Sequence, residues 1–160
     1  MIRQPLEGYE LESSGRHLIV ELHGCNAETL NDLKRIEALM RLAAESAKAT
    51  IVASVFHPFS PQGVTGVVVV EESHLSIHTW PEFGYAAVDF YTCGACLPER
   101  AYDVLKEGLA AQRAEVMEIR RGAYPPGPSL RVQTHYSEGV NAQEGRMKRE
   151  IKPKQERDPS

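Results

Sequence analysis

The feature that most constrains the fold of this chain is a series of short apolar runs rich in β-branched residues. The run 64–70 is the most extreme, because it contains four consecutive valines, Val67 to Val70. Such runs are typical of β-strands, and an unbroken apolar run is typical of a strand buried on both faces. We therefore predict a strand at 64–70 that is covered on both sides. Further strands or extended segments are predicted at residues 17–23, 50–56, 74–80, 85–91 and 114–120.

Two segments have the apolar spacing of amphipathic helices. Asn26 is a good N-cap, and apolar residues then recur at helical spacing up to Ala47. A second helix is predicted to begin at Pro98, since proline is favoured in the first helical turn. Strands outnumber helices and the connections have hairpin length. The fold class predicted is therefore α+β, a two-layer sandwich of a mostly antiparallel sheet with two helices on one face, whose other face could be covered by a second subunit.

A chain of 160 residues is expected to form one domain. We expect a flexible N-terminal lead-in at 1–14, the folded domain at 15–121, and a Pro-rich, charged and largely disordered C-terminal extension at 122–160. The net charge of −4 argues against a nucleic-acid partner. No apolar run approaches the roughly 20 residues of a membrane span, so no membrane partner is expected. Three cysteines, an odd number, fit a reducing, cytoplasmic location better than a disulfide scaffold.

A candidate reactive segment begins at Glu72 and Ser73, with His78 five residues and Cys93 twenty residues after the serine. A serine hydroxyl that attacks the preceding carbonyl converts an amide into an ester, and removal of the serine α-proton then expels the upstream chain. This chemistry needs a tightly held peptide and a base. His78 is the candidate base, and a turn or bend must return it to Ser73, because five extended residues would separate the two.

This segment, together with the upstream block 56–68, resembles the self-cleavage and active-site region of the bacterial and archaeal S-adenosylmethionine decarboxylases, which make their own pyruvoyl cofactor. The resemblance covers roughly residues 15–120 and is strongest at 56–94. It implies a proenzyme that cuts itself between Glu72 and Ser73. The products would be chains 1–72 and 73–160, the second starting with the pyruvoyl group.

The resemblance also implies the roles of individual residues. Ser73 becomes the pyruvoyl group, which takes the substrate amine as a Schiff base, without a metal or pyridoxal phosphate. His78 matches the proton acceptor of processing, and Thr65 stands where the family commonly shows a serine that supports processing. Cys93 matches the proton donor of catalysis.

The implied substrate is S-adenosylmethionine, and the decarboxylated product supplies aminopropyl groups for spermidine synthesis. Phe59 matches the residue that stacks on adenine, and Glu82 matches the one that binds the ribose hydroxyls. The implied assembly is a homodimer of processed protomers in which both protomers can contribute to each active site.

Two alternatives remain. Some relatives decarboxylate arginine or ornithine, although Phe59 and Glu82 favour a nucleoside-bearing substrate. The chain could instead be a non-catalytic, unprocessed metal-binding module, because Cys93 and Cys96 form a C-x-x-C pair. His74 and His78 are a weaker metal candidate, since four residues of extended strand place them about 13 Å apart.

Overall fold

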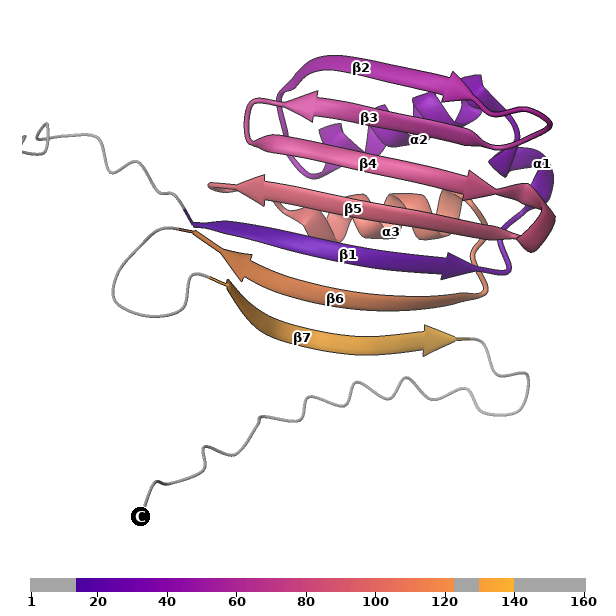
Figure 1. The fold of residues 1–160 in the computed structure, drawn as a ribbon. Helices are drawn as coiled ribbons and strands as arrows, with labels where there is room; N and C mark the ends of the chain where they lie inside the picture. Colours follow the sequence, from indigo (N-terminus) through magenta and orange to yellow (C-terminus); the bar gives the residue numbers. More distant parts are fainter. Residues whose placement is uncertain (1–13, 123–129, 140–160) are drawn as a thin grey trace, which may run out of the picture.

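The computed structural model describes residues 14–122 and 130–139. Seven antiparallel strands form a single sheet in the order β2-β3-β4-β5-β1-β6-β7 (Figure 1). The strands are β1 (Gly15–His23), β2 (Ile51–Pro58), β3 (Val64–Val70), β4 (Ser73–Trp80), β5 (Tyr85–Cys93), β6 (Arg113–Arg121) and β7 (Leu130–Gly139).

The two longer helices cover one face of this sheet, and in Figure 1 both lie behind it. They are α2 (Leu33–Ser46) and α3 (Pro98–Gly108), with a short α1 (Ala27–Leu30) and a 3-10 turn η1 (Pro81–Phe83) beside them. Ile36, Met40 and Leu105 from the helices are fully buried with Leu75 and Phe90 from the sheet. The predicted α+β sandwich with two main helices on one face is confirmed. No helix in the described ranges is long and apolar enough to cross a membrane.

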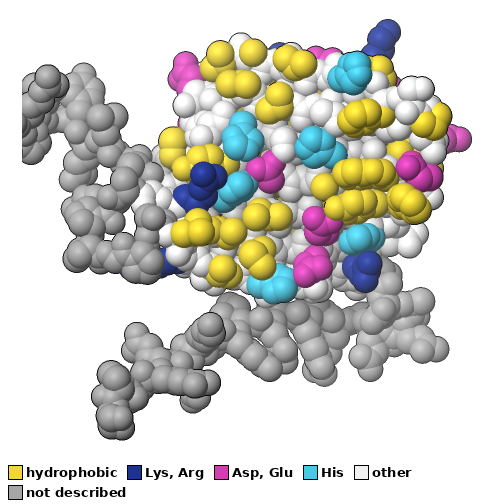
Figure 2. Space-filling view, in the orientation of Figure 1, with side chains coloured by type: hydrophobic (Ala, Val, Ile, Leu, Met, Phe, Trp, Pro, Cys, Tyr) yellow, Lys and Arg dark blue, Asp and Glu magenta, His cyan; other side chains and the backbone are white. Residues whose placement is uncertain are grey.

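Within residues 14–122 and 130–139, no helix lies over the opposite face of the sheet, which is called the open face below (Figure 1). Apolar and histidine side chains are scattered across it in Figure 2. Along β3, Val68 is 0% exposed under the helices whereas Val69 is 40% exposed on the open face. The prediction that the valine run is buried on both faces is therefore wrong for the single chain. Side chains alternate between the two faces of the sheet, and the described part of the chain covers only one of these faces.

The helix predicted from Asn26 to Ala47 is broken after one turn. Asn26 does cap the first part, α1, by accepting from the Thr29 amide at 2.9 Å. Asp32 then caps α2 as a second N-cap. Between them, the side chain of Asn31 accepts from the Gly63 amide at 2.9 Å. The break is thus stabilised by a loop far away in the sequence, which helical periodicity cannot show.

Strand β7 lies within the segment that was expected to be largely disordered. It pairs with β6 along its whole length, from Arg113 opposite Gly139 to Arg121 opposite Leu130. Most of its side chains are exposed, so the apolar alternation that marks a strand is weak in its sequence. For residues 130–139 the expectation of disorder is wrong. The expectations for 1–13, 123–129 and 140–160 lie outside the described residues.

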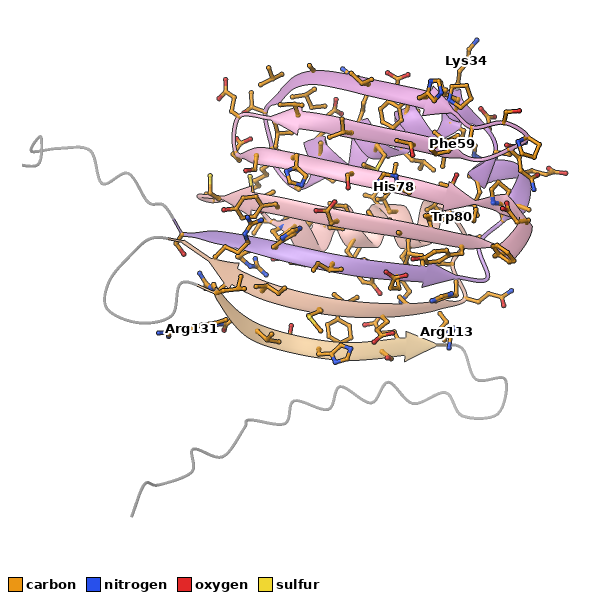
Figure 3. All side chains as sticks on the ribbon, viewed as in Figure 1. Lys34, Phe59, His78, Trp80, Arg113 and Arg131 are labelled. Carbon is orange, nitrogen blue, oxygen red and sulfur yellow. The ribbon has the colours of Figure 1, made fainter. Side chains whose placement is uncertain are left out.

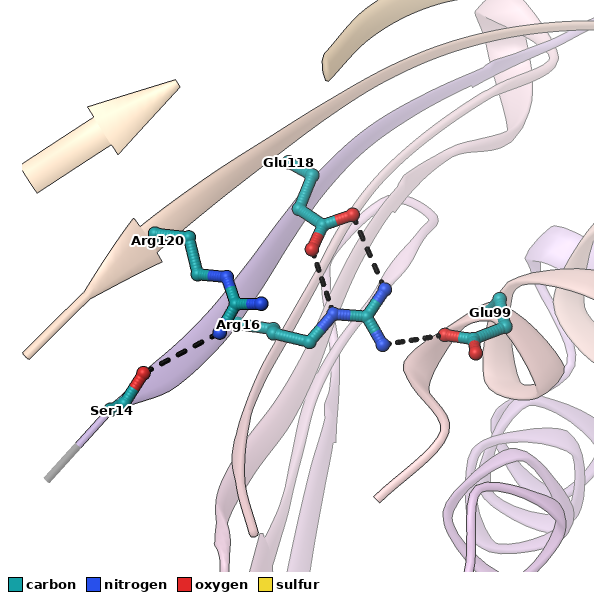
Figure 4. A network of polar contacts seen from close by, with 5 residues as sticks. All are labelled: Ser14, Arg16, Glu99, Glu118 and Arg120. Atoms are coloured by element: carbon teal, nitrogen blue, oxygen red, sulfur yellow. Dashed lines mark hydrogen bonds and ion pairs between the residues drawn. The ribbon is translucent and has the colours of Figure 1, made fainter. Parts of the chain in front are cut away.

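The N-terminal end of β1 is fastened to its neighbours by a charged network (Figure 4). Arg16 donates two hydrogen bonds to Glu118 on β6, at 2.7 and 3.2 Å, and one to Glu99 on α3, at 3.0 Å. Arg120 reaches Ser14 at 3.5 Å. A bidentate arginine–carboxylate pair fixes geometry as well as adding energy. The network therefore joins β1, β6 and α3 at the end of the sheet where β5 terminates.

Candidate active site

Ser73 begins β4 in an unusual backbone conformation. Its φ is +140°, a region that residues with a side chain rarely adopt. The carbonyl oxygen of Glu72, just before it, accepts a hydrogen bond from the backbone N–H of Cys93 at 3.1 Å. The structure thus brings the Glu72–Ser73 peptide and Cys93 together at one end of the sheet, called the serine end below.

His78 does not return to Ser73. Strand β4 pairs with β3 and with β5 without any register shift between Ser73 and His78. Hydrogen bonding on both sides holds the segment extended, so the two residues are about 16 Å apart along the strand. The predicted turn or bend between them is wrong.

His78 instead contacts Thr65, its cross-strand partner on β3. The Thr65 Oγ1 atom and the His78 Nδ1 atom are 2.8 Å apart. His78 is exposed on the open face, next to Trp80 on the same strand (Figure 3). The contact occupies Nδ1, so the hydroxyl of Thr65 orients the imidazole ring.

Phe59 directly follows β2, and Glu82 lies in η1 directly after β4. Both are therefore at the same end of the sheet as His78, which we call the histidine end. Phe59 opens a tight loop in which its amide donates to the Gly63 carbonyl at 2.8 Å. Gly63 has φ +102°, and a Cβ there would approach the Thr79 carbonyl oxygen to 2.6 Å, so the loop requires glycine. Gln62 in this loop donates to Glu82 at 3.2 Å. Phe59 is 51% exposed, with its ring free to be covered.

A row of stacked rings crosses the open face at the histidine end. It was not predicted from the sequence. Trp80 stacks on Tyr85 with ring centroids 5.0 Å apart, and Tyr85 stacks on His23 at 5.2 Å. The signal was present in the sequence: a tight connection between β4 and β5 places Trp80 opposite Tyr85. Burial raises the pKa of Tyr85 to about 12, assisted by its hydrogen bond to Glu21.

A polar cluster on the open face was also missed. Asp89 accepts from His17 at 2.6 Å, from His74 at 3.1 Å, and from Ser76. Burial alone would raise the pKa of Asp89, but the bonds from His17, Ser76 and His74 outweigh it and hold the pKa at about 2. The carboxylate is therefore ionised and fixes the orientation of both rings.

This cluster is the one group of three potential metal ligands in the described part of the chain, with donor atoms within 4.8 Å of one another. However, Arg121 approaches the Nδ1 atom of His17 at 3.2 Å. A guanidinium can only donate, so Nδ1 accepts and the proton of His17 is on Nε2, facing Asp89. A protonated nitrogen cannot bind a metal, so the geometry fits a hydrogen-bonded network rather than a metal site. His74 and His78 have separate partners, Asp89 and Thr65.

The C-x-x-C pair lacks the features of a reactive dithiol. All three cysteines are free thiols, and Cys96 and Cys25 are only 7% and 8% exposed. Burial, Glu72 and Cys93 all raise the pKa of Cys96, and burial raises the pKa of Cys25 to about 11. Zinc and redox sites need a lowered thiol pKa. Cys93 is the most solvent-accessible of the three cysteines.

The sequence and the fold of this chain are similar to those of known proteins. The family model of S-adenosylmethionine decarboxylase matches residues 16–122. S-adenosylmethionine decarboxylase proenzymes of Thermotoga maritima and Moorella thermoacetica are 51% and 50% identical over 115 and 123 residues, spanning 71% and 76% of this chain and 88% and 98% of theirs. The crystal structure of the Aquifex aeolicus adenosylmethionine decarboxylase superimposes with a TM-score of 0.64 at 36% identity, covering 73% of this chain and 98% of that one. The chain belongs to the S-adenosylmethionine decarboxylase family.

Proposed function

We propose that this S-adenosylmethionine decarboxylase proenzyme cleaves itself between Glu72 and Ser73 and decarboxylates S-adenosylmethionine with the pyruvoyl group that results. The observation that carries the proposal is the geometry of the scissile peptide. Ser73 has φ +140°, and the Glu72 carbonyl oxygen accepts from the Cys93 amide. A strained conformation at a functional position is one that the surrounding structure maintains.

Cleavage begins when the Ser73 hydroxyl attacks the Glu72 carbonyl carbon. Negative charge develops on the carbonyl oxygen, which the Cys93 N–H already contacts at 3.1 Å, and such a donor stabilises that charge. The C–N bond breaks and leaves an ester. A base then removes the Ser73 α-proton, the ester C–O bond breaks, and Glu72 departs as a carboxylate. The residue left behind is dehydroalanine. Water adds to its imine form, ammonia leaves, and the pyruvoyl group remains.

The base comes from a second copy of the chain. His78 is about 16 Å from Ser73 on its own strand, while the open face carries exposed apolar side chains, including Ile19, Val55 and Val69. Two copies that pair through this face in opposite directions would bring the histidine end of each over the serine end of the other. This arrangement supports a homodimer in which each site is shared.

In that dimer the partner's His78 acts as the base for processing. When its Nδ1–H is donated to Thr65, the Nε2 atom keeps the lone pair that a base needs. Threonine thus supplies the supporting hydroxyl at the position where the resemblance implied a serine. The partner's Phe59 and Glu82 would lie at the same shared site, because they are at the histidine end together with His78.

For decarboxylation, the pyruvoyl group supplies an electron sink for the substrate once it has formed at Ser73. The side chains of the protein bind the substrate and protonate the product. Phe59 offers an exposed ring for the adenine, and Glu82 offers a carboxylate that can accept from two ribose hydroxyls. Cys93, next to Ser73, donates the proton that replaces carbon dioxide. The product supplies aminopropyl groups for spermidine synthesis, and the three free thiols fit a cytoplasmic location.

The test is the intact mass of the purified protein under denaturing conditions, for wild type and for Ser73→Ala. We expect two wild-type fragments, 1–72 and 73–160, the second blocked by a ketone, and one whole chain for the variant. Decarboxylation of S-adenosylmethionine, arginine and ornithine is then compared on the processed protein. Phe59→Ala should raise the KM for S-adenosylmethionine by about 5-fold to 150-fold, as stacking is worth about 1–3 kcal/mol.

A folded wild-type chain that stays whole would refute the cleavage step. Faster turnover of arginine or ornithine would leave cleavage intact and overturn the choice of substrate. Bound zinc on an uncleaved chain would favour the metal-binding alternative.

A further inference from the structure

The carboxylate of Glu72 accepts two hydrogen bonds from Thr50, which lies in the connection between α2 and β2. The Thr50 amide donates to one carboxylate oxygen at 2.9 Å, and the Thr50 hydroxyl donates to the other at 3.1 Å. The Thr50 carbonyl in turn accepts from the Glu71 amide at 2.9 Å. One exposed residue thus binds the turn between β3 and β4 through three hydrogen bonds. Hydrogen bonds to an ionised carboxylate are stronger than those between neutral groups.

These bonds restrain the scissile peptide from the side opposite Cys93. The Glu72 carbonyl is held by the Cys93 amide at 3.1 Å, while its carboxylate is held by Thr50. Between them, the residue cannot rotate without breaking bonds at one end. Ser73 follows directly, with φ +140°. A conformation of this kind is strained and persists only where neighbouring contacts maintain it.

We propose that Thr50 is a positioning residue for self-cleavage, which holds Glu72 so that its carbonyl faces both the Cys93 amide and the Ser73 hydroxyl. The inference rests on the proposed self-cleavage. Thr50 acts on the first step, in which the Ser73 oxygen adds to the Glu72 carbonyl and the C–N bond is replaced by an ester. The threonine itself forms no bond to the reacting atoms.

The step is tested with three full-length variants made by pulse-labelled cell-free translation, so that the uncleaved chain can be followed in time. Thr50→Val removes only the hydroxyl and keeps the branched shape and the backbone amide. Thr50→Ser restores a hydroxyl. Thr134→Val, the same substitution on β7, is the matched control. Each sample is also treated with hydroxylamine, which cuts an ester but leaves an amide whole at neutral pH.

We expect Thr50→Val to cleave about 10-fold more slowly than wild type, as the loss of a hydrogen bond to a charged group predicts. Its uncleaved chain should resist hydroxylamine, because the chain is arrested before the ester forms. Thr50→Ser and Thr134→Val should cleave at close to the wild-type rate. Because the lost bond also exists in the folded proenzyme, Thr50→Val should lower the melting temperature by no more than a few degrees. If Thr50 had only a structural role, Thr50→Val would lower the melting temperature, and cleavage would be neither slowed by Thr50→Val nor restored by Thr50→Ser.

Equal rates for Thr50→Val and wild type would overturn the inference. So would accumulation of a hydroxylamine-sensitive chain, which would place the defect after the ester, or a failure of Thr50→Ser to restore the rate. A wild-type chain that never cleaves would instead overturn the proposed function, and the inference with it, so the two failures are distinguishable.

Discussion

Ser73 and His78 stand five residues apart on one uninterrupted strand, β4, yet they belong to opposite ends of the sheet. The first lies beside Cys93, and the second is bonded to Thr65. Alternation along β4 places His74, His78 and Trp80 on the open face, while Leu75 and Ile77 are buried under the helices. A single chain therefore has both halves of the proposed site without joining them.

This separation predicts complementation between two inactive variants. Ser73→Ala and His78→Ala homodimers should each stay whole. When differently tagged forms are co-expressed, a mixed dimer contains one complete site, with Ser73 from one chain and His78 from the other. In these mixed dimers every His78→Ala chain should be cleaved and every Ser73→Ala chain should stay whole, so that up to about half of all the chains are cleaved. The measurement is denaturing gel electrophoresis of dimers purified through both tags.

The double variant that carries both substitutions, co-expressed with His78→Ala, is the control and should give no cleavage, because Ser73 is present in one chain but His78 is absent from both. If mixed dimers stayed whole while wild type was processed, the shared site would be wrong, and His78 would have to reach Ser73 within its own chain through a rearranged β4.

Thiol alkylation should separate Cys93 from the other two cysteines. Cys25 is buried and its pKa is raised to about 11, and burial raises the pKa of Cys96 as well. The thiolate is the reactive form, so at pH 8 Cys25 should react about 100-fold more slowly than an ordinary exposed thiol. Peptide mapping after a limited exposure to iodoacetamide should find the label on Cys93, with loss of decarboxylation in proportion.

A Cys25→Ala/Cys96→Ala protein should be inactivated at the same rate as wild type. Labelling of Cys96 at the rate of Cys93 would instead indicate a reactive C-x-x-C pair.

Asp89 predicts a pH-dependent contribution to stability. Its pKa is held at about 2, below the ordinary 3.8, so ionisation favours the folded state. That contribution is fully present above about pH 4 and is lost as the pH falls toward 2. Asp89→Asn should lower the free energy of unfolding by about 2 kcal/mol at pH 7 and by almost nothing near pH 2.

The measurement is urea unfolding at a fixed protein concentration, in a Ser73→Ala background that keeps the chain whole. Asp103→Asn, on the exposed side of α3, is the control. A difference between Asp89→Asn and its parent that persisted unchanged at pH 2 would mean that packing, not ionisation, accounts for the loss.

Much of the sheet could be predicted from the sequence because its strands are rich in β-branched residues, as the run Val67 to Val70 shows. What the sequence could not show depends on contacts between distant segments. The break between α1 and α2 needs Asn31 to meet Gly63. The hydrogen bonds on the Glu72 carboxylate need Thr50 to lie beside Glu72. Whether His78 serves its own Ser73 depends on the straightness of β4, which its neighbouring strands impose.

Strand β7 is the largest structural difference from the sequence expectation, and its attachment gives a final prediction. Glu138 near the end of β7 accepts from Tyr102 at 2.8 Å and from Lys106 at 2.6 Å, both on α3. Its side chain is 15% exposed. Burial and this bond to Glu138 raise the pKa of Tyr102. On the same strand pair, His135 and Glu115 form an ion pair at 2.7 Å whose side chains are half exposed, at 50% and 51%.

The two pairs should therefore differ in their contribution to stability. Glu138→Gln weakens a partly buried bond to a charged group and should cost about 1–2 kcal/mol of unfolding free energy. Glu115→Gln removes a solvent-screened pair and should cost less than about 0.5 kcal/mol. Thermal unfolding of both variants in the Ser73→Ala background measures the difference. Ultraviolet titration should show Tyr102 ionising at lower pH in Glu138→Gln, because the acceptor is no longer an anion. A loss of less than about 0.5 kcal/mol for Glu138→Gln as well would mean that the contact between β7 and α3 contributes no more to stability than an exposed ion pair does.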